Sequence, residues 1–219
     1  MTDDHGSFMR AGALPDLERP PRDEVRGTVV ILGGSNERSA DFGFLTDQLS
    51  LAGFRVAVFD DVSIEPEAAR VGAERLLQDA RQQRPRLLIG SDIGATLAAD
   101  IAARTTGGLD AVVLAGIVTA ASRTPLPVGL ALPAARSVLA PALVFHGDAD
   151  TVTDVADAVS WATQLVFGAL RLVQHGDHGV LTGESRRTVA AAILLFLERQ
   201  RAGEPVLSDG FAPSPGRDA

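Results

Sequence analysis

Short apolar runs recur along the chain and alternate with longer stretches of mixed character. The runs are nearly continuous in apolar residues, many of them β-branched, rather than alternating with polar ones. Such runs are typical of parallel strands that are covered on both faces. The predicted strands are residues 28–32, 54–59, 86–90, 111–116, 142–147 and 169–174.

The stretches between these strands carry apolar residues at helical spacing. The predicted helices are residues 39–52, 65–83, 94–106, 153–167 and 184–201. Strands and helices that alternate in this way predict an α/β fold, with a doubly wound, mostly parallel sheet, helices on both faces and right-handed crossovers.

The distribution of proline and glycine divides the chain into three parts. Residues 1–26 are predicted to be an irregular arm, residues 27–202 a single domain, and residues 203–219 a flexible C-terminal tail. Within the domain, the apolar and proline-containing connection 117–140 is predicted to form a small lid, with a plain surface connection as the alternative.

Composition narrows the class of protein. A chain of 219 residues suits one domain with a sizeable core. The net charge of −8 argues against nucleic acid or an anionic membrane as the main partner. The absence of cysteine excludes disulfides, thiolate metal sites and a cysteine nucleophile. Because the sequence shows neither a membrane span nor a signal core, we expect a cytoplasmic protein. We also expect it to be a monomer or a homodimer.

Residues capable of chemistry follow three of the predicted strands. Asp92 lies in GSDIG at the turn into a helix, with Gly90 and Gly94 two residues to either side, as a strained strand–turn–helix elbow requires. Asp150 follows another strand in HGDADTV, and His178 follows a third in HGDHGV. Because ligand sites gather beyond the carboxyl ends of such strands, these side chains are predicted to share one site.

The elbow GSDIG, the acid loop HGDADTVT and the histidine loop GDHGV, in this order, resemble the α/β-hydrolase family over roughly residues 27–201. The loop spacing is similar to that of compact, capless members such as dienelactone hydrolases. This resemblance implies that Asp92 takes the nucleophile position, Asp150 the acid position and His178 the base position. It also implies an α/β-hydrolase fold without a large cap domain.

The same resemblance implies a site for a developing oxyanion. Its donors would be the backbone N–H group of Ile93, after the nucleophile, and that of Ser35 or Gly34. Such donors stabilise negative charge that develops in the transition state.

The identity of the nucleophile distinguishes this chain from most of the family. Aspartate takes this position in epoxide hydrolases and haloalkane dehalogenases, where it forms an ester that histidine-activated water cleaves. Those relatives carry a large cap and use cap tyrosines, whereas this chain has only residues 117–140 at that place and no tyrosine. Ile93 stands where dehalogenases commonly have a tryptophan.

These residues predict an enzyme that hydrolyses an ester, lactone or similar electrophile in a small apolar organic substrate, without a cofactor or a metal. Two alternatives stay open. Asp92 could act as a general base with His178 moving protons, which would support a cyclase, a lyase or a carbon–carbon bond-forming reaction such as conjugate addition. The chain could also be a catalytically silent binding protein.

Simpler roles compete for the two acids. Asp92 and Asp150 could each cap the helix that follows. Ser91 could be the nucleophile instead, although it lies one place from the centre of the elbow, and Asp148 could replace Asp150.

Competing interpretations also exist for the histidines. His175 lies nearer its strand than His178 and could be structural, and His146 is predicted to close its strand. A metal site built from His175, Asp177 and His178 is a weaker alternative. A phosphate loop at residues 33–36 is disfavoured because no phosphate-binding motif is complete there and the chain has no lysine.

Overall fold

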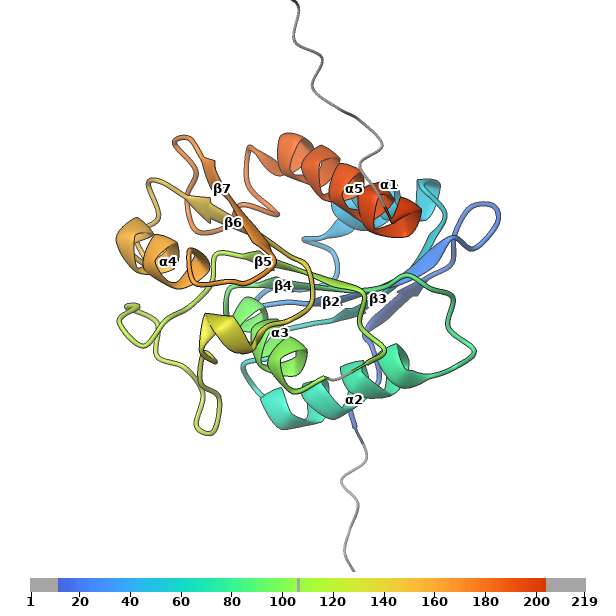
Figure 1. The fold of residues 1–219 in the computed structure, drawn as a ribbon, viewed down its shortest axis with the longest axis horizontal. Coiled ribbons are helices and arrows are strands. Elements are labelled where there is room, and N and C mark those ends of the chain that lie inside the picture. Colours follow the sequence, from blue (N-terminus) through green and yellow to red (C-terminus); the bar gives the residue numbers. More distant parts are fainter. Residues whose placement is uncertain (1–11, 106, 204–219) are drawn as a thin grey trace, which may run out of the picture.

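The computed structural model describes residues 12–105 and 107–203, which form a seven-stranded sheet between two layers of helices (Figure 1). The strand order is β1-β3-β2-β4-β5-β6-β7, and every pair is parallel except β1 with β3. The strands are β1 (Leu17–Arg19), β2 (Gly27–Leu32), β3 (Phe54–Phe59), β4 (Arg86–Ser91), β5 (Ala111–Ala115), β6 (Ala142–Gly147) and β7 (Gly168–Val173).

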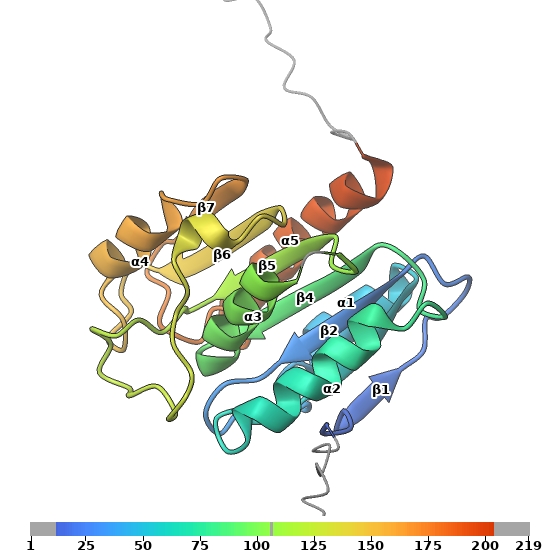
Figure 2. The same ribbon diagram turned by 60° about the horizontal axis from the view of Figure 1, so that its bottom comes forward.

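Helices cover both faces of the sheet (Figures 1 and 2). One face carries α1 (Gly43–Leu51) and α5 (Arg186–Ala202). The other carries α2 (Pro66–Gln78), α3 (Ile93–Arg104) and α4 (Val155–Ala162). This arrangement confirms the predicted α/β class with a mostly parallel sheet.

The central strands explain why the apolar runs are continuous. Along β2, Val29 and Ile31 pack toward α1 and α5, whereas Val30 and Leu32 pack toward the other helix layer. All four side chains are fully buried. Burying one such side chain contributes about 1.5–3 kcal/mol, so both faces of the strand favour this sheet.

The observed elements differ from the predicted ones at a few places. Residues 17–19, within the predicted irregular arm, form β1, where Leu17 pairs with Val58 at the edge of the sheet. Helix α2 ends at Gln78 rather than at residue 83, because Asp79 is extended with a ψ of 112°. The predictions for residues 1–11 and 204–219 lie outside the described residues.

The connection between β5 and β6 contains one short 3-10 helix, η1 (Ala135–Ser137). Leu130, Ala135 and Val138 are buried in the core on the α3 face. Trp161 of α4 donates a hydrogen bond of 2.8 Å from Nε1 to the Pro133 carbonyl. These contacts anchor part of the segment to the helix layer, and a lid over Asp92 stays a prediction.

Two further predictions concern a cap domain and a membrane-spanning helix. Between β5 and β6 the described chain has no regular element beyond η1, so the fold carries no large cap domain. Among the described residues, no helix is both long and apolar enough to cross a membrane.

Candidate active site

Three loops bring the predicted acids and histidine together. His178 Nε2 lies 2.9 Å from Asp92 Oδ1, and His178 Nδ1 lies 2.7 Å from Asp150 Oδ2. The side chains of Asp92, His178 and Asp150 are 11%, 19% and 0% exposed. They form one continuous network, which we call the Asp92–His178–Asp150 cluster.

The elbow that presents Asp92 is strained. Asp92 has a φ of 53° and a ψ of −124°, a conformation that disfavours a residue with a side chain and costs about 1–3 kcal/mol. A Cβ atom on Gly90 would lie 2.3 Å from the Gly94 carbonyl oxygen, and one on Gly94 would lie 2.2 Å from the Leu32 carbonyl oxygen. The two glycines therefore let the first turn of α3 lie directly against β4 and against the end of β2.

Asp92 does not cap the helix that it precedes. It occupies the N-cap position of α3, yet its side chain accepts no capping hydrogen bond there. Instead, Asp92 Oδ2 accepts a hydrogen bond of 2.8 Å from the Ser35 backbone N–H group. The capping interpretation of Asp92 is therefore wrong.

Asp150 is not a helix cap either. The N-cap of α4 is Asp154, whose side chain accepts from the Ala156 N–H group. Asp150 Oδ1 accepts instead from the N–H groups of Val152 and Thr153 in its own loop, at 2.7 and 3.1 Å. These bonds leave Asp150 Oδ2 facing His178.

The rival residues make other contacts. Ser91 is buried, and its hydroxyl donates to Glu37 at 2.9 Å rather than facing His178. The carboxylate of Asp148 accepts from the His175 backbone N–H group at 2.6 Å. Both Asp148 and His175 are exposed and lie outside the cluster.

The predicted oxyanion donors are placed differently from one another. The Ser35 N–H group points at Asp92, whereas the Gly34 N–H group donates to Glu37 Oε2 at 2.6 Å. Ile93 is the first residue of α3, so its N–H group has no carbonyl four residues earlier in the helix. The Gly34 N–H group is therefore taken by Glu37, and the role of Ser35 and Ile93 as oxyanion donors stays a prediction.

Both ring nitrogens of His178 face a carboxylate oxygen, an arrangement that suits a protonated imidazole, which donates from both nitrogens. Burial opposes this charge, but the hydrogen bonds and charges of Asp150 and Asp92 outweigh it and raise the pKa of His178 from 6.5 to about 9. This pKa favours the protonated form at neutral pH, and a protonated His178 can donate a proton.

Hydrogen bonds favour the ionised form of Asp150. Burial acts to raise its pKa, but the hydrogen bond from His178 and those from its own loop outweigh burial and lower the pKa overall. Behind it, the fully buried His146 places Nε2 3.3 Å from Asp150 Oδ2 and 3.1 Å from the Thr153 carbonyl oxygen. The predicted structural role of His146 thus includes holding the acid loop.

Glu37 lies next to the cluster and was not predicted from the sequence. Its two carboxylate oxygens accept hydrogen bonds from Gly34 and Ser91, on either side of Asp92. Burial raises its pKa, partly offset by these two bonds, and the nearby charge of Asp92 raises it further. Its position in the sequence could have indicated this, because Glu37, like Asp92, follows the carboxyl end of a predicted strand.

Among the described residues, no group of three or more histidine and acidic side chains is arranged to hold a metal ion. This finding contradicts the alternative of a metal site built from His175, Asp177 and His178.

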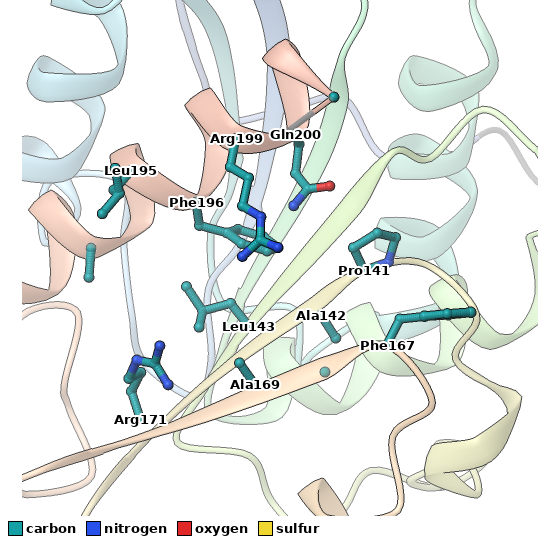
Figure 3. Close-up of a pocket in the computed structure, with 13 residues that line it drawn as sticks. Pro141, Ala142, Leu143, Phe167, Ala169, Arg171, Leu195, Phe196, Arg199 and Gln200 are labelled. Atoms are coloured by element: carbon teal, nitrogen blue, oxygen red, sulfur yellow. The ribbon is translucent and has the colours of Figure 1, made fainter. Parts of the chain in front are cut away.

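A large cavity lies away from the cluster, between α5 and the beginnings of β6 and β7 (Figure 3). It has a volume of about 600 Å³, and its lining combines apolar side chains such as Phe167 and Phe196 with Arg171 and Arg199. None of the residues of the cluster lines it.

The order of the strands, the elbow after β4 and the two loops after β6 and β7 define the α/β-hydrolase fold. No family model and no curated protein matches the chain, but solved structures do. A monoacylglycerol lipase from Paleococcus ferrophilus has a TM-score of 0.70 at 16% identity, with 84% of this chain and 98% of that chain covered.

Two further structures are similar over most of their length. Est1E from Butyrivibrio proteoclasticus has a TM-score of 0.70 at 14% identity, covering 88% of this chain and 99% of that one. A thioesterase domain from the curacin biosynthetic pathway has a TM-score of 0.64 at 14% identity, covering 81% and 93%. At these identities the likeness establishes the fold alone.

Proposed function

We propose that the protein is a compact, capless α/β-hydrolase-type enzyme that cleaves an ester, lactone or similar electrophile in a small apolar organic substrate. Asp92 is the nucleophile, His178 the proton carrier and Asp150 the residue that orients it. One observation carries this proposal: Asp92 Oδ1 meets His178, while Asp92 Oδ2 meets the Ser35 N–H group.

The first step uses the charged state of the resting site. Asp92 Oδ1 attacks the electrophilic carbon of the substrate, and the bond from that carbon to the leaving oxygen breaks. His178 Nε2 gives its proton to the leaving oxygen. The step ends with a covalent Asp92 ester or anhydride and a neutral His178.

The second step follows from the loss of charge on Asp92. Without that charge one cause of the raised pKa of His178 disappears, so the imidazole can take a proton from water. The water oxygen attacks Asp92 Cγ, and negative charge develops on Oδ2, which faces the Ser35 N–H group. Losing one such donor typically costs about 2.7–4 kcal/mol in transition-state stabilisation. Collapse breaks the bond between Cγ and Oδ1, and the product leaves with Oδ1 and takes a proton from His178. The new Asp92 carboxyl group then gives its proton to His178, which restores the Asp92 carboxylate and protonated His178.

Turnover in heavy-oxygen water tests this mechanism. The wild-type chain is incubated with p-nitrophenyl esters of short acyl chains and with simple lactones, and the peptides that contain Asp92 and Asp150 are analysed by mass spectrometry. We expect heavy oxygen in Asp92 but not in Asp150, which serves as the internal control. Turnover that leaves Asp92 unlabelled would reject a nucleophilic Asp92.

A second candidate function is a non-hydrolytic proton transfer, as in a cyclase, a lyase or an enzyme of conjugate addition. It is favoured by the pairing of a carboxylate base with an imidazolium acid 2.9 Å apart. In that case Asp92 would remain unlabelled, and the substrate would exchange a carbon-bound hydrogen with deuterated water. Neither label nor exchange, with ligand binding retained, would favour a silent binding protein.

A further inference from the structure

Glu37 bridges the two backbone segments that meet at Asp92. Its Oε2 atom accepts the Gly34 N–H group at 2.6 Å, and its Oε1 atom accepts the Ser91 hydroxyl at 2.9 Å. Gly34 belongs to the turn after β2, and Ser91 is the last residue of β4. A single carboxylate thus joins the turn to the elbow.

The turn that Glu37 holds is pressed against Asp92. A Cβ atom on Gly34 would lie 2.3 Å from the Asp92 Cβ atom, so the two backbones are in close approach. The next residue, Ser35, donates its N–H group to Asp92 Oδ2. Because Glu37 takes the Gly34 N–H group, the turn can offer Asp92 only the N–H group of Ser35.

Glu37 also belongs to the electrostatic environment of His178. The titratable groups that face His178 are Asp92 and Asp150, which touch it, and Glu37, whose charge reaches it, with His146 behind Asp150. A negative charge on Glu37 favours the protonated form of His178, although Asp150 and Asp92 are the groups that chiefly raise its pKa.

We propose that Glu37 is a positioning residue of the site, which clamps the turn after β2 to the elbow and selects Ser35 as the oxyanion donor. The part that concerns turnover rests on the proposed function. The effect of the Glu37 charge on His178 gives a second readout, because it can be measured without a substrate.

Matched variants separate this role from general support of the turn. Asp61 also binds the turn, since its Oδ2 atom accepts the Asn36 N–H group at 2.9 Å, but it does so on the exposed side. Glu37→Gln removes the charge and keeps the shape, and Glu37→Ala removes both. Asp61→Asn and Asp61→Ala make the same two changes on the far side of the turn.

The first measurement is the titration of the His178 ring protons by nuclear magnetic resonance. We expect Glu37→Gln to lower the pKa of His178 by about half a unit, about a threefold loss of proton affinity, because a negative charge that lies beyond the two contacting carboxylates is lost. Asp61→Asn should leave that pKa within about 0.2 units of the wild-type value. An unchanged His178 titration in Glu37→Gln would overturn the electrostatic role, whether or not the protein turns over a substrate.

The second measurement is the steady-state kinetics on whichever p-nitrophenyl ester or lactone the wild type hydrolyses. We expect Glu37→Ala to lower kcat about 10²-fold with little change in KM, as a misplaced donor does, and Asp61→Ala to lower it less than about threefold. Equal losses of kcat in the two alanine variants would overturn the positioning role, because Glu37 would then support the turn no differently from Asp61. If Glu37→Ala does not fold, the kinetics of Glu37→Gln decide the question, because glutamine has only one acceptor oxygen for the two donors that Glu37 holds.

Discussion

The two ends of the sheet differ in what they offer a ligand. At the carboxyl end, the Asp92–His178–Asp150 cluster concentrates three titratable groups within hydrogen-bonding distance, almost shielded from solvent. Near the amino ends of β6 and β7, a cavity of about 600 Å³ offers volume and two arginines, but no acid lines it. The first region therefore has converging reactive groups, and the second has volume without an acidic side chain.

This difference teaches that volume alone does not locate a site of reaction. A nucleophile needs a proton carrier beside it and donors for the developing charge, and the turns at the carboxyl ends supply all three. The strained elbow, the Ser35 N–H group and the start of α3 meet only there. We therefore base the functional proposal on the converging groups.

The largest effect is expected when one substitution in the cluster is compared with one in the cavity. We expect Asp92→Asn to lower kcat/KM about 10³-fold or more, because an amide is neither the nucleophile nor the base that the cluster needs. Arg199→Gln in the cavity should change it less than about twofold. Parallel kinetic assays check both values, and a larger loss from the cavity variant would reverse the comparison.

The next effect concerns the pH dependence of folding. The pKa of His178 is raised from 6.5 to about 9, so the stabilisation that it gives is complete below pH 6.5 and is lost as the pH rises through about 9. A shift of this size corresponds to on the order of 3 kcal/mol. The unfolding free energy of the wild type and of His178→Gln, measured by urea at pH 6 and pH 9.5, should converge at the higher pH.

Asp150 acts in the opposite pH range. The pKa of Asp150 is lowered, so its contribution to stability is present above its unfolded value of 3.8 and is lost as the pH falls.

For His178, an advantage of the wild type over His178→Gln that stayed constant from pH 6 to pH 9.5 would contradict the ion-paired geometry.

The smallest of these effects concerns the elbow. We expect Gly94→Ala to lower the unfolding free energy by about 1–3 kcal/mol, because the added methyl group meets the Leu32 carbonyl oxygen. Gly107→Ala serves as the control, since a Cβ atom there meets nothing within 4 Å. Thermal unfolding of both variants measures the difference, and equal values would mean that the elbow can relax.

Much of the fold could be predicted because the central strands are buried on both faces. Residues 54–59 and 142–147 form strands with the predicted bounds, since all of their residues except Arg55 are buried. Strand β1 gave no such signal. It is three residues long and lies at the edge, where pairing with β3 rather than an apolar run fixes it.

The candidate site was predictable in its members but not in its bonding. Three residues after three strands suggested a shared site, because parallel strands end at one edge. Which N–H group faces Asp92 depends on the path of a turn, and Glu37 fixes that path through contacts 54 residues away in sequence. Local patterns do not contain such contacts.

The backbone at Asp92 sets two contributions to stability against each other. A glycine at this position would adopt the same φ and ψ without strain, but it would remove the acceptors that His178 and the Ser35 N–H group now have. Relief of strain and loss of these bonds are each on the order of 1–3 kcal/mol. Heat resistance alone therefore gives this position little reason to keep its carboxylate, so an aspartate that persisted in thermostable descendants would point to a demand other than stability.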